Sequence, residues 1–415
     1  MRKHHSSMVA VLAVLAVLML ILAACTGGGS SPSGAASASA STSTSTAPGS
    51  DAPSESAAPS EGEATGYCRP IGDASAPESQ APEMAEPGSS ELKVGVVTDV
   101  GTLDDRNFNQ FSWEGALLGA EMIGAPEPES IITTESSEYE GNIQTFVDES
   151  YDVVVTVGFA LGEATLAAAE ANPDVHFVGV DQFQGNDPMD NYESLIFNEA
   201  QAGYLAGIVA ASISKNDEIA AIGGSGTIPP VVNYMRGYEN GAMSVNPDIT
   251  VHLKYISDDL AAAFNDPAGG KTFGDQFLQQ NENVDVLFQV AGKTGNGLLQ
   301  SVQEADIYGI GVDVDQWFST PDSAECIVTS AEKKLTKAVS DAIVAVGDEA
   351  PRSSNVFYGA DNDGIGLAPF YQFEDLISSE TQGLIDDAFE QMAAGDLDAC
   401  EPSGLCFAGE PDTGN

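Results

Sequence analysis

The stretch KVGVVTDVGTLDDRNFNQFSWEGALLGAEM, residues 93–122, decides the fold of this chain. It begins with a β-branched run over residues 94–97, which is too apolar for an edge strand and too short for a helix, and therefore predicts a buried parallel strand. Turn-forming polar residues follow, and an amphipathic helix is expected to begin near Phe108. A buried strand, a polar loop and a helix in this order are typical of an open α/β sheet.

The polar loop after this strand is a candidate ligand site. Ligands of open α/β sheets bind beyond the carboxyl ends of the strands, which is where the loop would place Asp99, Asp105, Phe108 and Asn109. An aromatic ring beside carboxylates suits a flat polar ligand. The same residue types also cap helices and form turns, and Phe108 could pack beneath the helix, so a purely structural role stays open.

The first 24 residues predict an export signal. Arg2 and Lys3 precede an apolar run over residues 8–24, which is shorter than the roughly 20 residues that a membrane-spanning helix needs. The run ends in LAAC at residues 22–25, which resembles a bacterial lipobox in which Cys25 would be lipidated. We therefore expect a lipid-anchored protein on the extracytoplasmic face of the cell membrane. A plain secretory signal with a coincidental cysteine is the alternative.

Residues 25–91 predict a disordered tether. They are rich in Ser, Ala, Thr, Gly, Pro and Glu, with few large apolar side chains that could drive burial. Proline and acidic residues extend such a segment, which would hold the folded part away from the membrane surface. The sequence GYCRPI at residues 66–71 is an exception, because its apolar residues and Cys68 suggest that this patch docks on the folded part.

The charge of the chain excludes nucleic acid as a partner. The formal net charge is −49, and removal of Arg2 and Lys3 with the leader would leave 12 basic against 63 acidic residues, a net charge of −51. Polyanion binding requires clustered Lys and Arg, and the whole chain has only 14 basic residues. An acidic surface also suppresses association, so we expect a monomer.

About 320 residues follow the tether, which is more than one ordinary domain core requires and enough for two lobes. Short β-rich runs recur between helical segments, and this alternation predicts right-handed βαβ units and parallel sheets covered by helices. The predicted strands after the first lie at residues 152–157, 176–180, 218–222, 250–256, 284–290, 307–312 and 326–329.

Small or polar residues follow four more of these strands, as they follow the first. A glycine permits close approach of a ligand to the backbone, and carboxylates accept its hydrogen bonds. The residues that we add to the candidate ligand site on this ground are Phe159, Asp181, Gly292, Lys293 and Asp313.

Motifs for other chemistries do not occur. The glycines at residues 292–297 lack the spacing of a Walker loop, and no G-x-G-x-x-G follows a strand. His176 and His252 lie in no metal-ligand or nucleophile spacing, and no G-x-S-x-G elbow occurs. We therefore expect a protein that is not an enzyme and that uses no cofactor and no metal.

Four cysteines remain after Cys25, and outside the cytoplasm they are expected to pair. Four cysteines allow three connectivities. The Pro- and Gly-containing turn between Cys400 and Cys406 favours a disulfide between these two, which leaves Cys68 for Cys326. A free, buried Cys326 is the alternative.

Ordered blocks of sequence resemble the basic membrane protein (BMP, PnrA-like) family of substrate-binding lipoproteins. The opening block is TDVG at 98–101 with DD at 104–105, FN at 108–109 and WEG at 113–115. Further blocks lie at residues 152–155, 179–181, 198–207, 229–241, 264–267, 290–297, 311–316, 329–333 and 364–369. The resemblance implies a type I periplasmic binding-protein fold, in which two doubly wound parallel-sheet lobes are joined by three crossovers. It also implies a receptor that delivers a nucleoside to the permease of an ABC importer.

On this basis the domain boundaries can be stated. We expect the N-terminal lobe to comprise residues 92–198 and about 326–357, and the C-terminal lobe residues 199–325 and about 358–397. Residues 398–415 would form a cysteine-containing tail.

The resemblance also assigns roles to single residues. Phe108 and Phe264 would cover the two faces of a purine-type base. Asp99, Asn109 and Asp181 would form hydrogen bonds with the base edge. Asp313 and Lys333 would hold the ribose hydroxyls. The family usually has Gly-Gly where this chain has Gly292-Lys293, so the choice of ligand could differ. A receptor for a sugar or another small polar metabolite, or a surface adhesin, are the alternatives.

Overall fold

The computed structural model describes residues 66–72, 89–401, 406 and 412–414. The predicted export signal, Cys25 and most of the predicted tether lie outside these residues. Within the described ranges, no helix is both long and apolar enough to cross a membrane.

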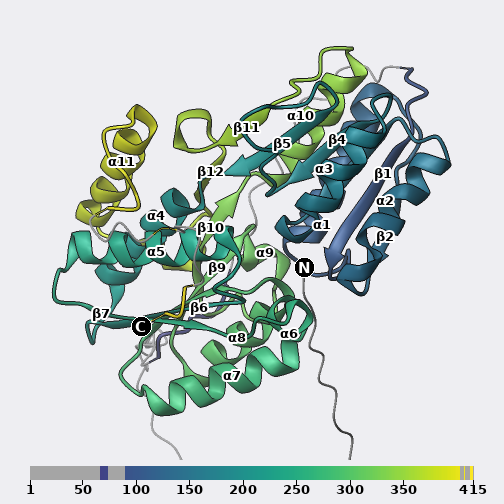
Figure 1. Ribbon diagram of the computed structural model, residues 1–415. Coiled ribbons are helices and arrows are strands. Elements are labelled where there is room, and N and C mark those ends of the chain that lie inside the picture. The colour runs from purple at the N-terminus through teal and green to yellow at the C-terminus, as the bar shows by residue number, and fades with distance from the viewer. Residues whose placement is uncertain (1–65, 73–88, 402–405, 407–411, 415) are drawn as a thin grey trace, which may run out of the picture. The chain divides into compact units, whose positions relative to one another are not determined.

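The first of two six-stranded sheets contains the strand predicted at residues 94–97, and all its strands are parallel (Figure 1). Its strands, in spatial order, are β2 (Glu129–Thr133), β1 (Val94–Val100), β3 (Val153–Val157), β4 (His176–Val180), β5 (Tyr192–Phe197) and β11 (Asn355–Tyr358). The helices of this lobe are α1 (Phe108–Ile123), α2 (Tyr139–Asp148), α3 (Gly162–Ala171) and α10 (Leu335–Gly347), with the short turns η1 (Ser136–Glu138) and η2 (Phe159–Leu161).

Successive side chains of β1 pack into hydrophobic cores on opposite faces of the sheet. Val94 and Val96 pack in the core that includes residues of α1 and α10, whereas Val97 packs in the core of α2 and α3. Gly95 lies under the ring of Phe146, where an added Cβ would be only 2.6 Å from the ring. The run is apolar on both faces because helices cover both, as its composition predicts.

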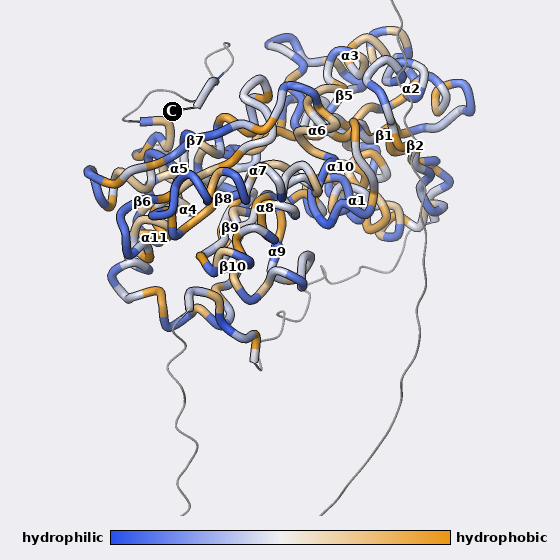
Figure 2. The backbone as a smooth tube through the Cα atoms, turned by 90° about the horizontal axis from the view of Figure 1, so that it is seen from below, coloured by the Kyte–Doolittle hydropathy of each residue, from blue (hydrophilic) through white to orange (hydrophobic). Residues whose placement is uncertain are grey.

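The second sheet repeats the strand order of the first. Five of its strands are parallel, and only β12 is antiparallel to its neighbour. Its strands, in spatial order, are β7 (Thr250–Tyr255), β6 (Glu218–Gly223), β8 (Val286–Val290), β9 (Tyr308–Asp313), β10 (Ile327–Lys333) and β12 (Ile365–Leu367). Figure 2 shows hydrophobic and hydrophilic segments alternating along the chain.

Helices also cover both faces of the second sheet. The helices of the larger core are α4 (Glu199–Ile213), α5 (Pro229–Val245) and α11 (Ser379–Ala394), and those of the other face are α7 (Pro267–Gln280) and α8 (Gly292–Ala305). The remaining short helices are α6 (Leu260–Phe264), α9 (Gln316–Ser319), η3 (Ala360–Asn362) and η4 (Tyr371–Leu376). Helices α4 and α5 pack with their backbones in close contact. A Cβ on Gly203 of α4 would lie only 2.1 Å from the carbonyl oxygen of Tyr234 on α5, so glycine is required there.

The chain passes between the two lobes three times, after β5, after β10 and between β11 and β12. Two doubly wound parallel-sheet lobes with three crossovers are thus observed, as expected. The boundary near residue 326 is corrected. Strand β10 pairs with β9 in the second sheet, so the second crossover follows Lys333 and residues 327–333 belong to the C-terminal lobe.

Both ends of the described chain are fastened to the second lobe. Cys68 is joined to Cys326, and Cys400 to Cys406, which is one of the three connectivities that the sequence allows. The backbone N–H groups of Tyr67 and Cys68 also donate to Asp306, at 3.0 and 2.9 Å. The patch at residues 66–71 therefore docks on the folded part.

Candidate ligand-binding site

A cavity lies at the carboxyl ends of strands from both sheets. Its empty space is about 700 Å³, counting the part that opens to solvent. The sequence-predicted residues that line it are Asp99, Asp105, Phe108, Asn109, Phe159, Asp181, Phe264, Gly292, Lys293, Asp313 and Lys333. The structure thus gathers all the predicted ligand residues, although they differ in what their polar atoms contact.

The first lobe contributes two carboxylates from neighbouring strand ends. Asp99 belongs to β1, and Asp181 follows β4 with a left-handed φ of 59°. Gly158, at the end of β3, has a φ of 113°, and a Cβ there would lie 2.0 Å from Asp99 Oδ2. Only glycine meets both demands without strain. Asp181 Oδ1 is buried and has no hydrogen-bond partner among the described residues.

The N-terminus of α1 presents Phe108 and Asn109 to the cavity and is held by Asp105. The Asp105 carboxylate accepts the backbone N–H groups of Asn107, Asn109 and Gln110 at 2.8–3.0 Å. Asp105 therefore caps the helix, and its oxygens are already used. Asn109 Oδ1, by contrast, is buried without a partner in the described part of the chain, which leaves it available to a ligand donor.

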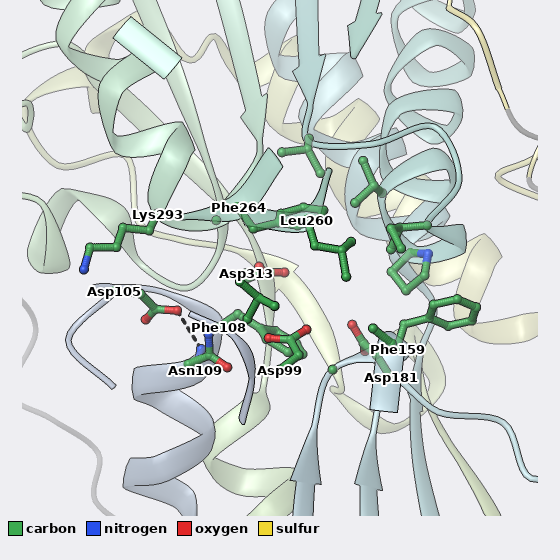
Figure 3. Close-up of a pocket in the computed structure, with 18 of the residues that line it drawn as sticks. Asp99, Asp105, Phe108, Asn109, Phe159, Asp181, Leu260, Phe264, Lys293 and Asp313 are labelled. Atoms are coloured by element: carbon green, nitrogen blue, oxygen red, sulfur yellow. Dashed lines mark hydrogen bonds between the residues drawn. The ribbon is translucent and has the colours of Figure 1, made fainter. Parts of the chain in front are cut away.

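The second lobe contributes an aromatic wall. Phe264 ends α6, and its ring lies against Gly224, where an added Cβ would come within 2.3 Å of it. Gly292 has a left-handed φ of 52° and lies beside Phe264. Figure 3 shows Phe264 on one side of the cavity and Phe108 and Asn109 on the other. Two aromatic rings from different lobes thus enclose the same space.

A buried lysine lies among three carboxylates at one end of the cavity. The Lys333 ammonium is 2.6 Å from Asp181 Oδ2, 3.2 Å from Glu199 Oε1 and 3.9 Å from Asp313 Oδ1, and the Lys333 side chain is only 2% exposed. It also lies 5.3 Å from the centre of the Phe108 ring. Burial alone would lower the pKa of Lys333, but the three carboxylates raise it above its ordinary value. Lys333 is therefore charged and orients these acids.

Burial lowers the pKa of a lysine but raises that of a carboxyl group, because it disfavours the charged form of each. It raises the pKa of Asp313 to about 6, against the lowering effect of Lys333, and that of Glu199 to about 7. Burial, with the nearby carboxylates Asp105 and Asp181, raises the pKa of Asp99 well above its usual range. A carboxyl group that keeps its proton can donate a hydrogen bond as well as accept one. The cavity thus offers both kinds of polar partner.

Lys293 lines the cavity, but its ammonium group contacts the opposite lobe. Its Nζ donates to Thr102 Oγ1 at 2.8 Å and lies 3.3 Å from Asp104 Oδ1. The Lys293 ammonium is thus bound to protein atoms of the first lobe.

Sequence reasoning missed several lining or supporting residues. Glu199 begins α4 just beyond β5, so the rule that pointed to the other strand ends would have found it had β5 been predicted. Tyr234 also lines the cavity, but it lies within α5, and the sequence around it does not distinguish it from a core residue of that helix. The apolar residues that complete the lining are Val100, Ala160, Ile228, Pro230, Val231, Leu260 and Val290.

The arrangement suits reversible binding of a flat polar molecule. Aromatic rings offer faces for stacking, and Asn109 Oδ1 and Asp181 Oδ1 offer acceptors that no described residue occupies. Among the residues that the structure describes, no group of three or more His, Cys, Asp or Glu side chains could hold a metal ion.

Comparison with known proteins identifies the family. Residues 92–391 match the family Bmp, described as ABC transporter substrate-binding protein PnrA-like. The "ABC transporter nucleoside-binding protein BmpA" of Lactococcus lactis is 30% identical over 318 residues, covering 72% of this chain and 88% of that protein. The "CD4+ T-cell-stimulating antigen" of Listeria monocytogenes is 28% identical, with coverage of 74% and 88%.

A solved structure agrees in fold. An ABC transporter solute-binding protein from Aeropyrum pernix superimposes with a TM-score of 0.66 at 26% identity, covering 74% of this chain and 92% of that one. The family comprises extracytoplasmic binding proteins rather than a class of enzymes, and it implies a small-molecule ligand and a transporter as partners. The chain therefore belongs to the PnrA-like (Bmp) family of ABC transporter substrate-binding proteins.

Proposed function

We propose that the protein captures a purine nucleoside between its lobes and delivers it to the permease of an ABC importer. The observation that carries this proposal is the pair Phe108 and Phe264, which come from opposite lobes and enclose a cavity lined by carboxylates. Aromatic faces bind a planar base, and ionised carboxylates accept bonds from vicinal hydroxyls. The printed name of the Lactococcus lactis relative, a nucleoside-binding protein, also supports it.

The proposed contacts follow from which polar atoms are free. Asn109 Oδ1 and Asp181 Oδ1, which have no partner among the described residues, would accept the donors of the base edge. Asp99, whose raised pKa favours the protonated form, would donate to a ring nitrogen. Asp313 would accept the ribose hydroxyls, while Lys333 holds Asp313 and Asp181 in place.

Calorimetry tests this assignment. We expect guanosine, adenosine or inosine to bind and ribose to be silent. Phe108→Ala should weaken nucleoside binding by about 1–3 kcal/mol, or one to two decades, because it removes one stacking face. Phe318→Ala is the matched control, since Phe318 is exposed and does not line the cavity. Tight binding of ribose or another sugar, with every nucleoside silent and Phe108→Ala neutral, would overturn the proposal.

We also propose that the protein is anchored by a lipid on Cys25, which lies outside the described residues. Cys25→Ser is expected to release the protein from the membrane fraction, because the acyl chains on the lipidated cysteine supply the membrane affinity. The measurement is immunodetection of the protein in membrane and soluble fractions. A variant that still sediments with membranes would contradict the anchor, and a Cys68→Ser variant, which leaves the lipobox intact, is the control.

A further inference from the structure

Hydrogen bonds outside the proposed ligand contacts join the two lobes. Besides the Lys293 bonds, Asn296 Nδ2 donates to the backbone oxygen of Asp105 at 3.0 Å. Ser319 Oγ donates to the backbone oxygen of Arg106 at 2.8 Å. These donors lie on α8 and α9 of the second lobe, and their acceptors lie in residues 102–106 of the first, a segment that we call the latch loop. In the opposite direction, Arg106 Nη1 of the latch loop donates to Asp322 Oδ2 of the second lobe at 3.5 Å.

The latch loop is coupled to the part of the first lobe that faces the cavity. The Asp105 side chain caps α1, and the first residues of that helix are Phe108 and Asn109. Arg106, next to Asp105, has a left-handed φ of 60°, a conformation that a non-glycine residue adopts only when its surroundings hold it. The latch loop is therefore an ordered part of the first lobe, fixed to α1, and it offers the second lobe a defined surface to bind.

Buried amides in the second lobe orient the Asn296 side chain. Gln316 Nε2 donates to Asn296 Oδ1 at 3.2 Å, so the Asn296 amino group is left to face the latch loop. Gln316 is fixed in turn, because its Oε1 accepts from Gln289 Nε2 and from the backbone N–H of Val312. Gln289 and Gln316 are fully buried. The donor to the first lobe is thus preorganised by the core of the second.

We propose that Lys293 and Asn296 bind the latch loop as a closure device, and that they set ligand affinity through the equilibrium between open and closed lobes without touching the ligand. If only the closed form binds tightly, the apparent dissociation constant is the intrinsic one divided by the closed fraction. Every ligand should then be affected by the same factor. The inference does not depend on whether that ligand is a nucleoside.

Charge reversal tests the contribution of Lys293. Asp104 is exposed and does not line the cavity, so Asp104→Lys alters the latch without altering the proposed ligand contacts. Asp104→Lys and Lys293→Glu should each lower the ratio of closed to open protein, by about two- to tenfold. The double variant, which restores opposite charges, should return toward wild type. Lys271→Ala is the control, because among the described residues Lys271 forms ion pairs with Asp275 and Glu304, both of its own lobe.

The primary readout is small-angle X-ray scattering of the ligand-free protein at low and high salt. We expect a more extended profile for each single charge reversal, with the difference fading at 1 M salt, where charges are screened beyond about 3 Å. Asn296→Ala should extend the protein at both salt concentrations, because its bond is to a backbone carbonyl. Identical profiles for wild type, Asp104→Lys and Asn296→Ala would overturn the proposal.

Ligand affinity provides the second readout, with guanosine and inosine as probes. Asp104→Lys should weaken both by one common factor. Different factors for the two probes would show that the latch loop acts through ligand contacts instead, and would overturn the proposal. Failure of both probes to bind wild type would count against the nucleoside assignment, while the scattering comparison would still decide on the latch.

Discussion

Replacing Lys333 with methionine is expected to lower the free energy of unfolding by about 3–5 kcal/mol, because it removes the only ammonium group within 4 Å of Asp181, Glu199 and Asp313 among the described residues. Methionine is close to lysine in length and leaves no large cavity, so the loss reports on charge. Urea denaturation at pH 8 measures it.

The pH dependence of this loss separates charge from packing. A carboxyl group whose pKa is higher in the folded than in the unfolded state lowers the free energy of unfolding as pH rises. The loss begins near the pKa of the unfolded state and is complete above the pKa of the folded state. Asp313, at about 6, and Glu199, at about 7, already behave in this way, and without Lys333 their pKa values should rise further. At pH 5 these acids are protonated to a larger extent, so the difference between wild type and Lys333→Met should be smaller than at pH 8.

Lys334→Met is the matched control. Lys334 is adjacent in sequence, is partly exposed, in contrast to the buried Lys333, and pairs with Glu332 at 2.6 Å. Ion pairs near the surface contribute about 0–1 kcal/mol, so this variant should unfold nearly as wild type does. A Lys333→Met variant that resembles Lys334→Met, or whose destabilisation is equal at pH 5 and pH 8, would refute the view that Lys333 compensates buried charge.

Most strands that were predicted from sequence are buried on both faces, although the edge strand β7 was predicted as well and the buried strand β5 was not. β1, β3, β4 and β8 read as apolar runs because helices cover both sides of each sheet. β2 was missed because it is an edge strand with three exposed residues of five, which lets it carry polar side chains. The boundary at residue 326 was wrong because the sheet that β10 joins depends on tertiary pairing and not on its own sequence.

The cavity-lining residues could be predicted because parallel strands bring their carboxyl ends to one edge. The rule placed Asp99, Asp181 and Asp313 correctly along the cavity. This rule does not predict which partners the polar atoms of these residues bind. Asp105 uses its oxygens to cap α1, and Lys293 bonds to the first lobe, although both line the cavity. These orientations depend on neighbours from distant parts of the chain.

Asp313→Ala is expected to weaken nucleoside binding by about 2–5 kcal/mol, since truncating one partner of a buried, charged hydrogen bond costs this much. Free guanine should bind the variant and wild type equally, because it has no ribose hydroxyl to lose. Asp181 and Glu199 remain beside Lys333, so the lysine stays paired. Calorimetry of guanosine and guanine measures both effects.

Backbone strain at this position needs its own control. Asp313 has a left-handed φ of 64°, which alanine tolerates poorly and asparagine tolerates well. Asp313→Asn therefore keeps the backbone and removes the charge, and it should still lose about 1.5–3 kcal/mol of nucleoside affinity. Asp363→Ala, at a φ of 60° and outside the cavity lining, reproduces the strain alone and should leave affinity unchanged.

The pKa of Asp313 gives the same prediction a pH signature. Burial raises that pKa to about 6, with Lys333 opposing the rise and Asp181 and Asp105 adding to it. Only the ionised carboxylate accepts both ribose hydroxyls, so nucleoside affinity should fall by about tenfold for each pH unit below 6. Asp313→Asn should flatten this dependence between pH 5 and pH 7. An equally steep fall in Asp313→Asn, or an equal loss of guanosine and guanine in Asp313→Ala, would remove Asp313 from the ribose site.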